Sequence, residues 1–375
     1  MAVLDVLLRM VAGAGGVALV LWTVGGALRT VVLPRATSSW QVTLIFGLLR
    51  RVVFDPLTRP RRGFEARDRI MAMYAPVGLL MLPAMWATFV VTGCTGVFWA
   101  FGVRPFSEAF VTSGSSLLTL GFVRPHQTGL VIVSFAEAFV GLGLVSLLIS
   151  YLPTIYGSFS RREAYVAMLE VRAGQPPSPS TLLVRYHRIG WLDGIAEEFF
   201  ALWEQWFVEV EESHTSLPVL VFFRSPLSAR SWITAAGCVL DTAALASALL
   251  DRPKTGRDDI VLRTGFLALR RIADGFSLAY PADPAPSDPI SISRTDFDEV
   301  CAELEAAGIA LKPDRDQAWT DFAGWRVNYD AALLGLCDLV MAPPARWSSD
   351  RSAGWAHPNR TAATGIRRLS PRRRG

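Results

Sequence analysis

Pro-Phe-Ser-Glu-Ala-Phe-Val-Thr-Ser-Gly-Ser-Ser-Leu-Leu-Thr-Leu-Gly-Phe-Val occupies residues 105–123 and lies between two long apolar segments. We do not expect the stretch itself to span a membrane. Its first part, roughly residues 106–118, is compatible with a short helix, and Thr119-Leu120-Gly121-Phe122 follows. A second apolar segment resumes at Gly129. This order predicts a chain that enters the membrane, turns back and then crosses it.

Irregular backbone at membrane depth is tolerated only where protein buries it or where it lines a water-filled cavity, because hydrocarbon cannot satisfy peptide groups. A filter lined by backbone carbonyls is the main example of such an arrangement. An outer helix, a short helix, a threonine–glycine segment and an inner helix, in that order, are what an ion-conducting pore requires.

Three segments are apolar enough to cross a bilayer, for which about 20 apolar residues suffice. They are Met10–Leu28 (19 residues without a charge), Ile70–Val103 (34) and Ala138–Ser160 (23, extending outward to Gly129 across Glu137). The sequence after residue 164 resembles that of a soluble domain. A cleaved signal peptide in place of the first span is disfavoured, because its apolar core is long and Asp5 interrupts a basic leader.

The distribution of arginine predicts the topology. Nine arginines lie between residues 29 and 69, whereas the 103–128 loop contains two. Since positive charge is retained on the cytoplasmic side, we expect the N-terminus and this loop outside, and the arginine-rich segment and the C-terminal region inside. Only two of the 37 basic residues are lysines, a composition typical of GC-rich bacterial genomes, so the expected location is the bacterial inner membrane, as a multi-pass protein.

Residues 70–163 resemble the two-helix pore module of the tetrameric potassium channel superfamily, over about a quarter of the chain. Thr119-Leu120-Gly121-Phe122 stands at the place of the family's Thr-Val-Gly-Tyr-Gly filter. Gly143 lies 22 residues beyond Gly121, where the family has a hinge glycine that acts in gating. The resemblance implies a homotetramer whose four loops bind K⁺ or another monovalent cation through backbone carbonyls, with no other cofactor.

The ion-binding filter implied by the resemblance comprises Thr119, Leu120, Gly121, Phe122 and Val123, with Arg124 at the pore mouth. Val123 replaces the family's second filter glycine, and Arg124 replaces the acid that usually follows. A β-branched residue is disfavoured where φ is positive. The resemblance therefore implies a cation pore more strongly than strict potassium selectivity. A rebuilt outermost ion site, a non-selective pore and a non-conducting pore are the three alternatives.

Glu137 is the ionisable residue that lies deep in a spanning segment. Such residues are functional candidates, because burial of a charge in a membrane is costly. We expect its carboxylate either to accept hydrogen bonds from the cluster of Ser113, Ser115 and Ser116, or to pair with Arg124. Either contact supports the filter from behind. An exposed carboxylate in the outer vestibule is the alternative.

The inner helix contains the candidate gating and cavity residues. Gly143 as a hinge competes with Gly141 and Gly143 as sites of close helix packing, since small residues let membrane helices approach. The side chains expected to line the cavity are Val140, Leu144, Leu147 and Tyr151. Pro153 removes a helix hydrogen bond and either shapes the intracellular gate or marks the end of the helix.

The predicted fold class is an all-α membrane protein with three transmembrane helices, a re-entrant pore helix and filter, and a helical cytoplasmic C-terminal domain. Its parts are an N-terminal transmembrane helix (1–33), a cytoplasmic interfacial helix with a basic linker (34–69), the pore module (70–163), the helical domain (164–342) and a disordered basic tail (343–375). Periodicity predicts helices over 191–213, 226–251, 258–279, 295–307 and 314–341. Trp40–Phe54 lies either at the membrane interface, with arginines near anionic headgroups, or against the C-terminal domain.

Several classes are disfavoured by what the sequence lacks. No helix has arginine at every third position, so a voltage sensor is not expected. No strand–GxGxxG–helix pattern indicates a nucleotide-binding domain, and scattered histidines and cysteines indicate neither an enzyme nor a metal site. The expected partners are copies of the chain and membrane lipids, without nucleic acid, and the sequence names no cytoplasmic ligand. The alternative is a membrane-anchored cytosolic sensor or interaction protein with a degenerate pore segment.

Overall fold

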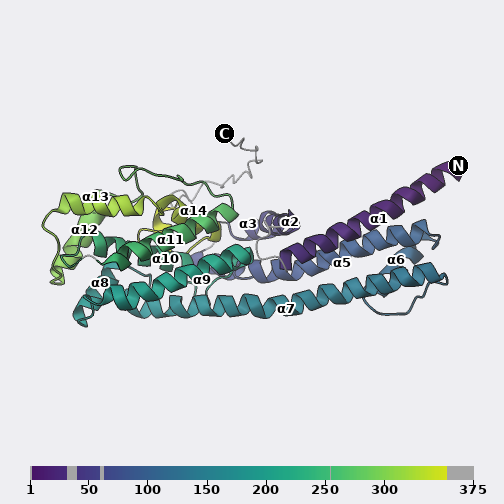
Figure 1. The fold of residues 1–375 in the computed structure, drawn as a ribbon, viewed down its shortest axis with the longest axis horizontal. Helices are drawn as coiled ribbons and strands as arrows, with labels where there is room; N and C mark the ends of the chain where they lie inside the picture. The colour runs from purple at the N-terminus through teal and green to yellow at the C-terminus, as the bar shows by residue number, and fades with distance from the viewer. Residues whose placement is uncertain (1, 32–39, 60–62, 254, 353–375) are drawn as a thin grey trace.

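The computed structural model describes residues 2–31, 40–59, 63–253 and 255–352 of the 375-residue chain. These residues form helices and loops, with one isolated β-bridge, between Leu250 and Leu311, and no strand. Long helices extend from one end of the molecule and a cluster of shorter helices forms the other end (Figure 1). The all-helical prediction is therefore confirmed for the described residues.

Three helical stretches are long and apolar enough to cross a membrane, as predicted: Val3–Thr30, Phe64–Ala100 and Thr128–Ala173. The first is α1 (Ala2–Val31) and the last is α7 (Thr128–Ala173). The middle one consists of α4 (Phe64–Met71) and α5 (Tyr74–Ala100), which a turn at residues 72–73 separates. α1 lies along α5 at glycine positions, since a Cβ on Gly16 would lie 2.3 Å from the carbonyl oxygen of Gly93.

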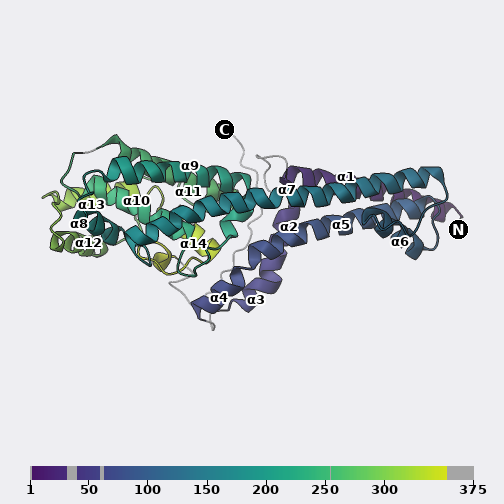
Figure 2. The same cartoon turned by 90° about the horizontal axis from the view of Figure 1, so that it is seen from below.

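α6 (Phe106–Leu117) packs between α5 and α7 at the end of the molecule that contains the N-terminus (Figures 1 and 2). Residues 118–127 then run without regular structure from the C-terminus of α6 to the first residue of α7. The opposite end of α7 enters the C-terminal helical cluster. Pro153 lies inside α7, which continues to Ala173, so the alternative in which Pro153 ends the helix is wrong.

The C-terminal helical domain has one large apolar core, to which Val166, Leu169 and Ala173 of α7 already belong. α7 therefore passes into this core without a break. The helices that follow are α8 (Pro179–Arg188), α9 (Ala201–Ser216), α10 (Trp232–Ala248), α11 (Gly256–Gly275), α12 (Arg294–Ala306), α13 (Arg315–Arg326) and α14 (Asp330–Val340). The predicted helix over 314–341 is two helices, and α8 was not predicted.

A buried ion-pair network crosses this core. Arg326, at the end of α13, donates from Nη1 to both carboxylate oxygens of Asp241 on α10, at 2.6 and 2.8 Å. Its Nε donates to Asp330 on α14 at 2.7 Å, and its Nη2 to the carbonyl of Trp347 at 2.6 Å. Tyr329 donates to the same Asp241. Three helices and the segment after α14 are joined through one guanidinium group.

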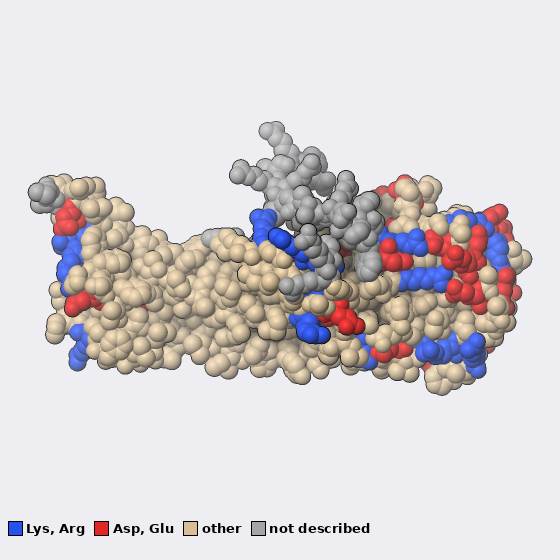
Figure 3. Space-filling model, turned by 180° about the vertical axis from the view of Figure 1, so that it is seen from behind, with Lys and Arg blue, Asp and Glu red and all other residues tan. Residues whose placement is uncertain are grey.

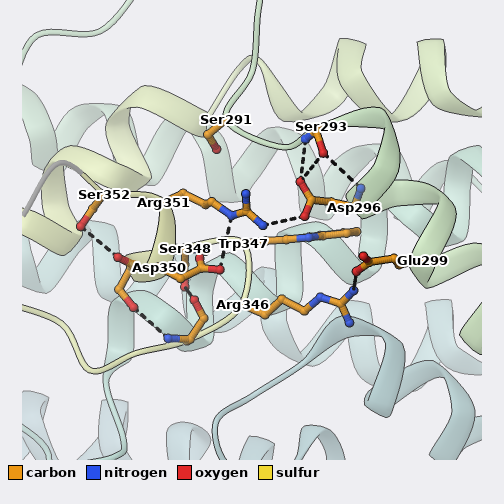
Figure 4. A network of polar contacts seen from close by, with 12 residues as sticks. Ser291, Ser293, Asp296, Glu299, Arg346, Trp347, Ser348, Asp350, Arg351 and Ser352 are labelled. Atoms are coloured by element: carbon orange, nitrogen blue, oxygen red, sulfur yellow. Dashed lines mark hydrogen bonds and ion pairs between the residues drawn. The ribbon is translucent and has the colours of Figure 1, made fainter. Parts of the chain in front are cut away.

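The predicted disordered tail begins too early. Residues 343–352 are ordered, and Trp347 is fully buried against the domain core. Arg346 pairs with Glu299 of α12, and Arg351 pairs with Asp296 (Figure 4). Arg346 also pairs with Glu303 of the same helix. The polar composition of this segment predicts disorder. Its side chains nevertheless contact α12, which is distant in sequence. The remainder of the predicted tail, residues 353–375, lies outside the described residues.

The segment predicted as an interfacial helix forms α2 (Trp40–Leu49), a π-helical turn η1 (Arg50–Phe54) and α3 (Asp55–Leu57). Two of its polar side chains face the protein: Gln41 accepts from Trp86 Nε1 at 3.1 Å, and Arg50 Nη1 donates to the carbonyl of Leu339 at 2.9 Å. The segment thus contacts both the base of α5 and the C-terminal domain. Residues 32–39 and 60–62 on either side lie outside the described residues.

Candidate functional site

The loop after α6 folds its N–H groups against the last turn of that helix. The N–H of Thr119 donates to Ser116 O at 3.0 Å, and those of Leu120 and Gly121 donate to Ser115 O at 2.9 and 3.4 Å. The N–H of Val123 reaches the Ser115 hydroxyl at 3.4 Å. The free carbonyls at the end of α6 are therefore satisfied by the loop itself.

The same bonds set the direction of the loop carbonyls. In a trans peptide the N–H of one residue and the C=O of the residue before it point in opposite directions. Because the N–H groups of Leu120, Gly121 and Val123 face α6, the carbonyls of Thr119, Leu120 and Phe122 point away from it. No hydrogen bond among the described residues ends on these three oxygens. The side of the loop that faces away from α6 therefore presents three peptide oxygens without a partner among the described residues.

The backbone of this loop is not that of a strand. Thr119 has φ of +55° and Gly121 has φ of +71°, and Leu120 lies between them with φ outside the positive region. The conflict expected at Val123 does not occur, because Val123 does not have positive φ. Arg124 is exposed, and none of the ion pairs in the described part of the chain includes it.

Glu137 is buried, with 2% of its surface exposed, and its Oε1 accepts a hydrogen bond from Ser113 Oγ at 2.5 Å. Of the arrangements expected from the sequence, this is the contact with the serine cluster and not the pair with Arg124 or the exposed carboxylate. Ser115 bonds the loop instead, and Ser116 donates to Thr112 O within α6. A single carboxylate thus joins α7 to the helix that supports the loop.

The thiol of Cys94 on α5 is the other polar side chain beside Glu137. Oε2 of Glu137 has no hydrogen-bond partner among the described residues. The sequence did not single out Cys94, because no pattern links it to a carboxylate 43 positions away. Three helices, α5, α6 and α7, therefore meet at one buried acid.

Gly141 and Gly143 differ in their surroundings. A Cβ on Gly141 would lie 2.1 Å from the carbonyl oxygen of Leu117, at the end of α6. A Cβ on Gly143 would meet nothing within 4 Å. Gly141 is therefore the position of close helix packing, and Gly143 has no such role within one chain.

The predicted cavity-lining residues lie mostly on the packed side of α7. Leu144 is buried in the apolar cluster of α5 and α6, and Val140 and Tyr151 pack against the same cluster. Leu147 is partly exposed. A different row of large side chains is exposed, spaced by three or four residues: Ile132, Phe135, Phe139, Leu142, Val145, Ile149, Leu152 and Tyr156. This row is the face of α7 that a single chain leaves uncovered.

Two arginines that the sequence did not single out connect the long helices to the C-terminal domain. Arg162 on α7 is 3% exposed and donates to the carbonyls of Leu220 and Phe223 at 2.9 and 2.7 Å. Arg224, next along the same segment, pairs with Asp68 of α4 and donates to Met341 O at 2.9 Å. The segment from Leu217 to Arg224 is thus bonded to α7, to α4 and to the residue that follows α14.

His214 completes this junction. Its Nε2 accepts from Arg162 Nη1 at 3.0 Å, and its Nδ1 lies 3.1 Å from Ser213 Oγ. Burial and the neighbouring guanidinium of Arg162 hold the pKa of His214 well below its ordinary value of 6.5. The imidazole is therefore neutral, as its acceptor role requires.

Acidification is expected to weaken the junction through His214. In the unfolded chain the imidazole binds a proton below about pH 6.5, whereas the folded one resists it. Stability is therefore complete above that pH and falls as the pH drops below it, by at most about 1.4 kcal/mol per unit. The thermal midpoint of the full chain in detergent, measured from pH 7.5 to 5, should fall less in His214→Gln than in the unchanged protein. Equal falls would contradict the assignment.

Comparison with models of known protein families, with curated protein sequences and with solved structures found no match to this chain. The class of protein must therefore be inferred from the arrangement of the three long apolar helices, the loop after α6 and the buried carboxylate of Glu137.

Proposed function

We propose that this chain is a subunit of a homotetrameric channel that conducts K⁺ or other monovalent cations through a pore lined by backbone carbonyls, without a voltage sensor. The observation that carries the proposal is the loop at residues 118–123. Its N–H groups are bonded to α6, and its free carbonyl oxygens face the other way. Peptide oxygens of this kind replace the hydration shell of a cation when several chains present them around one axis.

The exposed side chains of the same region support assembly of several copies. Leu120 and Phe122 are 58% and 65% exposed in the single chain. Peptide oxygens without partners are costly at membrane depth, so the loop requires neighbours that cover its side chains and water or ions that meet its carbonyls. One loop per chain in a closed ring satisfies both requirements, and fourfold symmetry is what the resemblance to potassium channels implies.

The distribution of charge supports the proposed topology in the bacterial inner membrane. Figure 3 shows charged side chains at the outer tip and at the start of the C-terminal domain, with a band almost free of charge between them. α5 alone, with 27 residues, spans about 40 Å, which exceeds the roughly 30 Å of a bilayer core. Arginine enrichment at the inner end of the band favours an external N-terminus and a cytoplasmic C-terminal domain.

Assembly and flux of the purified chain test the proposal. The full chain in detergent should have the mass of four protomers, and liposomes that contain it should release K⁺ down a gradient, with block by Ba²⁺. Protein-free liposomes supply the background rate. A monomer without flux would overturn the proposal and favour the membrane-anchored sensor, in which residues 118–124 conduct nothing.

Substitution of the two inner-helix glycines should have different effects. Gly141→Ala places a methyl group against the carbonyl of Leu117 and forces α6 and α7 apart. Overpacking of this kind costs about 1–3 kcal/mol, so we expect a lower thermal midpoint and a smaller tetramer fraction. Gly143→Ala is the matched control, because its methyl group would meet nothing within 4 Å among the described residues. Equal stability of the two variants would contradict the packing assigned to Gly141.

The Ser113–Glu137 contact should be measurable as a coupling energy. Glu137→Gln and Ser113→Ala each disturb one hydrogen bond behind the loop, and residues in direct contact show interaction energies of about 0.5–3 kcal/mol in a double-mutant cycle. We expect each single variant to change the rate of flux or its decay, and the double variant to add little. If Glu137→Gln leaves flux, cation preference and decay unchanged, this carboxylate does not support the filter.

A further inference from the structure

The segment from Trp40 to Leu57 is apolar on two faces. One face packs against α5 and the C-terminal domain and includes Ile45, Phe46, Leu49 and Phe54. The opposite face is exposed: Leu44, Leu48, Val52, Val53 and Leu57 show 46, 59, 63, 40 and 42% of their surfaces. Leu44, Leu48 and Val52 follow one another at steps of four residues and form a continuous stripe. Burial of apolar surface is favourable, so a continuous exposed stripe indicates a surface that another apolar phase or partner covers.

The exposed arginines beside this stripe differ from those of the C-terminal domain. Arg51, Arg59 and Arg69 are exposed, and no ion pair of the described residues includes them. Many arginines of the C-terminal domain are paired with acids, namely Arg230, Arg252, Arg257, Arg271, Arg294, Arg315, Arg326, Arg346 and Arg351. Within the described part of the chain, many arginines of the domain thus have acidic partners, whereas three cations between residues 51 and 69 have none.

Nearby acids do not neutralise these three cations. Asp68 is paired with Arg224, and Asp55 Oδ1 lies 3.6 Å from Arg50 Nε. Glu65 is the other acid of α4. It is exposed, and no ion pair of the described residues includes it. A positive surface next to an apolar stripe is therefore a property of this part of the molecule.

The position of the stripe is fixed by contacts with the spanning helices. Gln41 accepts a hydrogen bond from Trp86 of α5. A Cβ on Gly78 of α5 would lie 2.4 Å from the ring of Phe46. Tyr74 at the start of α5 donates to Phe46 O at 3.0 Å. Figure 2 shows α2, α3 and α4 at the junction of the long helices with the C-terminal domain, with α3 and α4 projecting to one side. The segment therefore runs along the first half of α5, from Trp86 to Tyr74, toward the C-terminal domain.

We propose that α2, η1 and α3 lie in the cytoplasmic leaflet, with Leu44, Leu48 and Val52 against acyl chains and with Arg51, Arg59 and Arg69 bound to phosphates of anionic phospholipids. This proposal rests on the membrane topology of the proposed function but not on conduction. An interfacial helix binds through apolar area together with attraction to anionic lipid. The two terms correspond to the stripe and the three arginines. The same segment contacts Phe222 and Leu339 of the C-terminal domain, so lipid binding sets the position of that domain relative to the bilayer.

The depth of the stripe is measured with a spin label on the full chain in liposomes of phosphatidylcholine and phosphatidylglycerol. All four native cysteines are buried, so the label attaches selectively at Leu48→Cys. Ile260→Cys is the matched control, since Ile260 is a similarly exposed aliphatic residue, at 47%, on α11 of the C-terminal domain. We expect the label at position 48 to be relaxed more by oxygen than by a water-soluble nickel complex, and the label at position 260 to show the reverse.

The charge is tested with a fluorescent short-chain phosphatidylglycerol, titrated into the full chain in a neutral detergent. Each arginine near an anionic surface contributes about fivefold in binding, so Arg51→Gln, Arg59→Gln and Arg69→Gln should each raise the dissociation constant by about that factor. Arg188→Gln and Arg263→Gln are the controls, because both arginines are exposed in the C-terminal domain and should leave the constant unchanged. A phosphatidylcholine probe should bind weakly to every variant.

Three outcomes would overturn the proposal. A label at position 48 that behaves like the one at position 260 would place the stripe in water. A label shielded from both relaxing agents, with dipolar broadening, would place a second copy on the stripe. Unchanged phosphatidylglycerol binding in the arginine variants would remove the charged site. Each readout is independent of K⁺ flux, so a failure here and a failure of the channel are distinguished by which assay is negative.

Discussion

Replacement of Gly121 by alanine is expected to reduce K⁺ flux to the background of protein-free liposomes while the four chains still assemble. Gly121 has φ of +71°, a conformation that costs a residue with a Cβ about 1–3 kcal/mol. In the proposed channel four chains supply one filter, so the cost would be counted four times in a single pore. The loop relieves this strain by rotating the peptide groups of Leu120 and Gly121, which turns their carbonyls away from the axis. Flux per tetramer, with the oligomer measured in the same preparation, is the readout.

Two glycines provide matched controls for this variant. Gly102 has φ of +101° in the turn after α5, so Gly102→Ala introduces similar strain outside residues 118–123. Gly114 lies within α6 with nothing within 4 Å of its Cβ position, so Gly114→Ala adds the same methyl group without strain. We expect both to conduct. Flux that survives in Gly121→Ala, or is lost equally in Gly102→Ala, would contradict the role of this loop in conduction.

The long apolar helices could be predicted from sequence because composition alone determines them. Uninterrupted apolar runs of this length have few alternatives to a spanning helix, and all three are found. The contact between Ser113 and Glu137 was one of the predicted alternatives for a similar reason. A carboxylate deep in an apolar run must find a polar partner, and Ser113 of α6 provides one.

The junction with the C-terminal domain could not be predicted in this way. Arg162 bonds His214, 52 positions along the chain, and Arg224 bonds Asp68, 156 positions away. Neither pair has a local pattern, because each depends on how two separate groups of helices come together. The buried segment around Trp347 was missed for the same reason, since its polar composition hides one aromatic side chain that fills a distant core.

Helix rotation limited the interpretation of α7. Gly141 and Gly143 are two residues apart and therefore about 200° apart around the helix. Sequence indicates that both are small but not which one faces α6. The direction of the predicted cavity-lining residues, among them Leu144, could not be assigned for the same reason. Leu144 lies with Gly141 on the packed side of α7. Assignment of a face requires the contacts of a neighbouring helix.

Arg326→Met is expected to destabilise the C-terminal domain by about 3–5 kcal/mol, the usual cost of removing one member of a buried ion pair. Arg326 is fully buried, and although burial lowers its pKa, the carboxylates of Asp241 and Asp330 raise it above the ordinary value. Without the guanidinium, the hydrogen bond from Tyr329 is the one that the described residues still provide to Asp241. The carbonyl of Trp347 also loses its donor, which loosens residues 343–352. Urea unfolding of the full chain in detergent, followed by tryptophan fluorescence, measures the loss.

The pH dependence of this variant separates a stranded charge from a simple loss of packing. Burial raises the pKa of Asp241, which Arg326 opposes in the unchanged protein. In Arg326→Met the folded carboxyl therefore binds a proton more readily than the unfolded one, so part of the lost stability should return as the pH falls from 7 toward 5. Arg257→Gln is the control, since it removes an exposed pair with Glu197 and surface pairs contribute little. A deficit in Arg326→Met that is small, or that does not change with pH, would show that Asp241 has found another partner and that the network does not hold α10, α13 and α14 together.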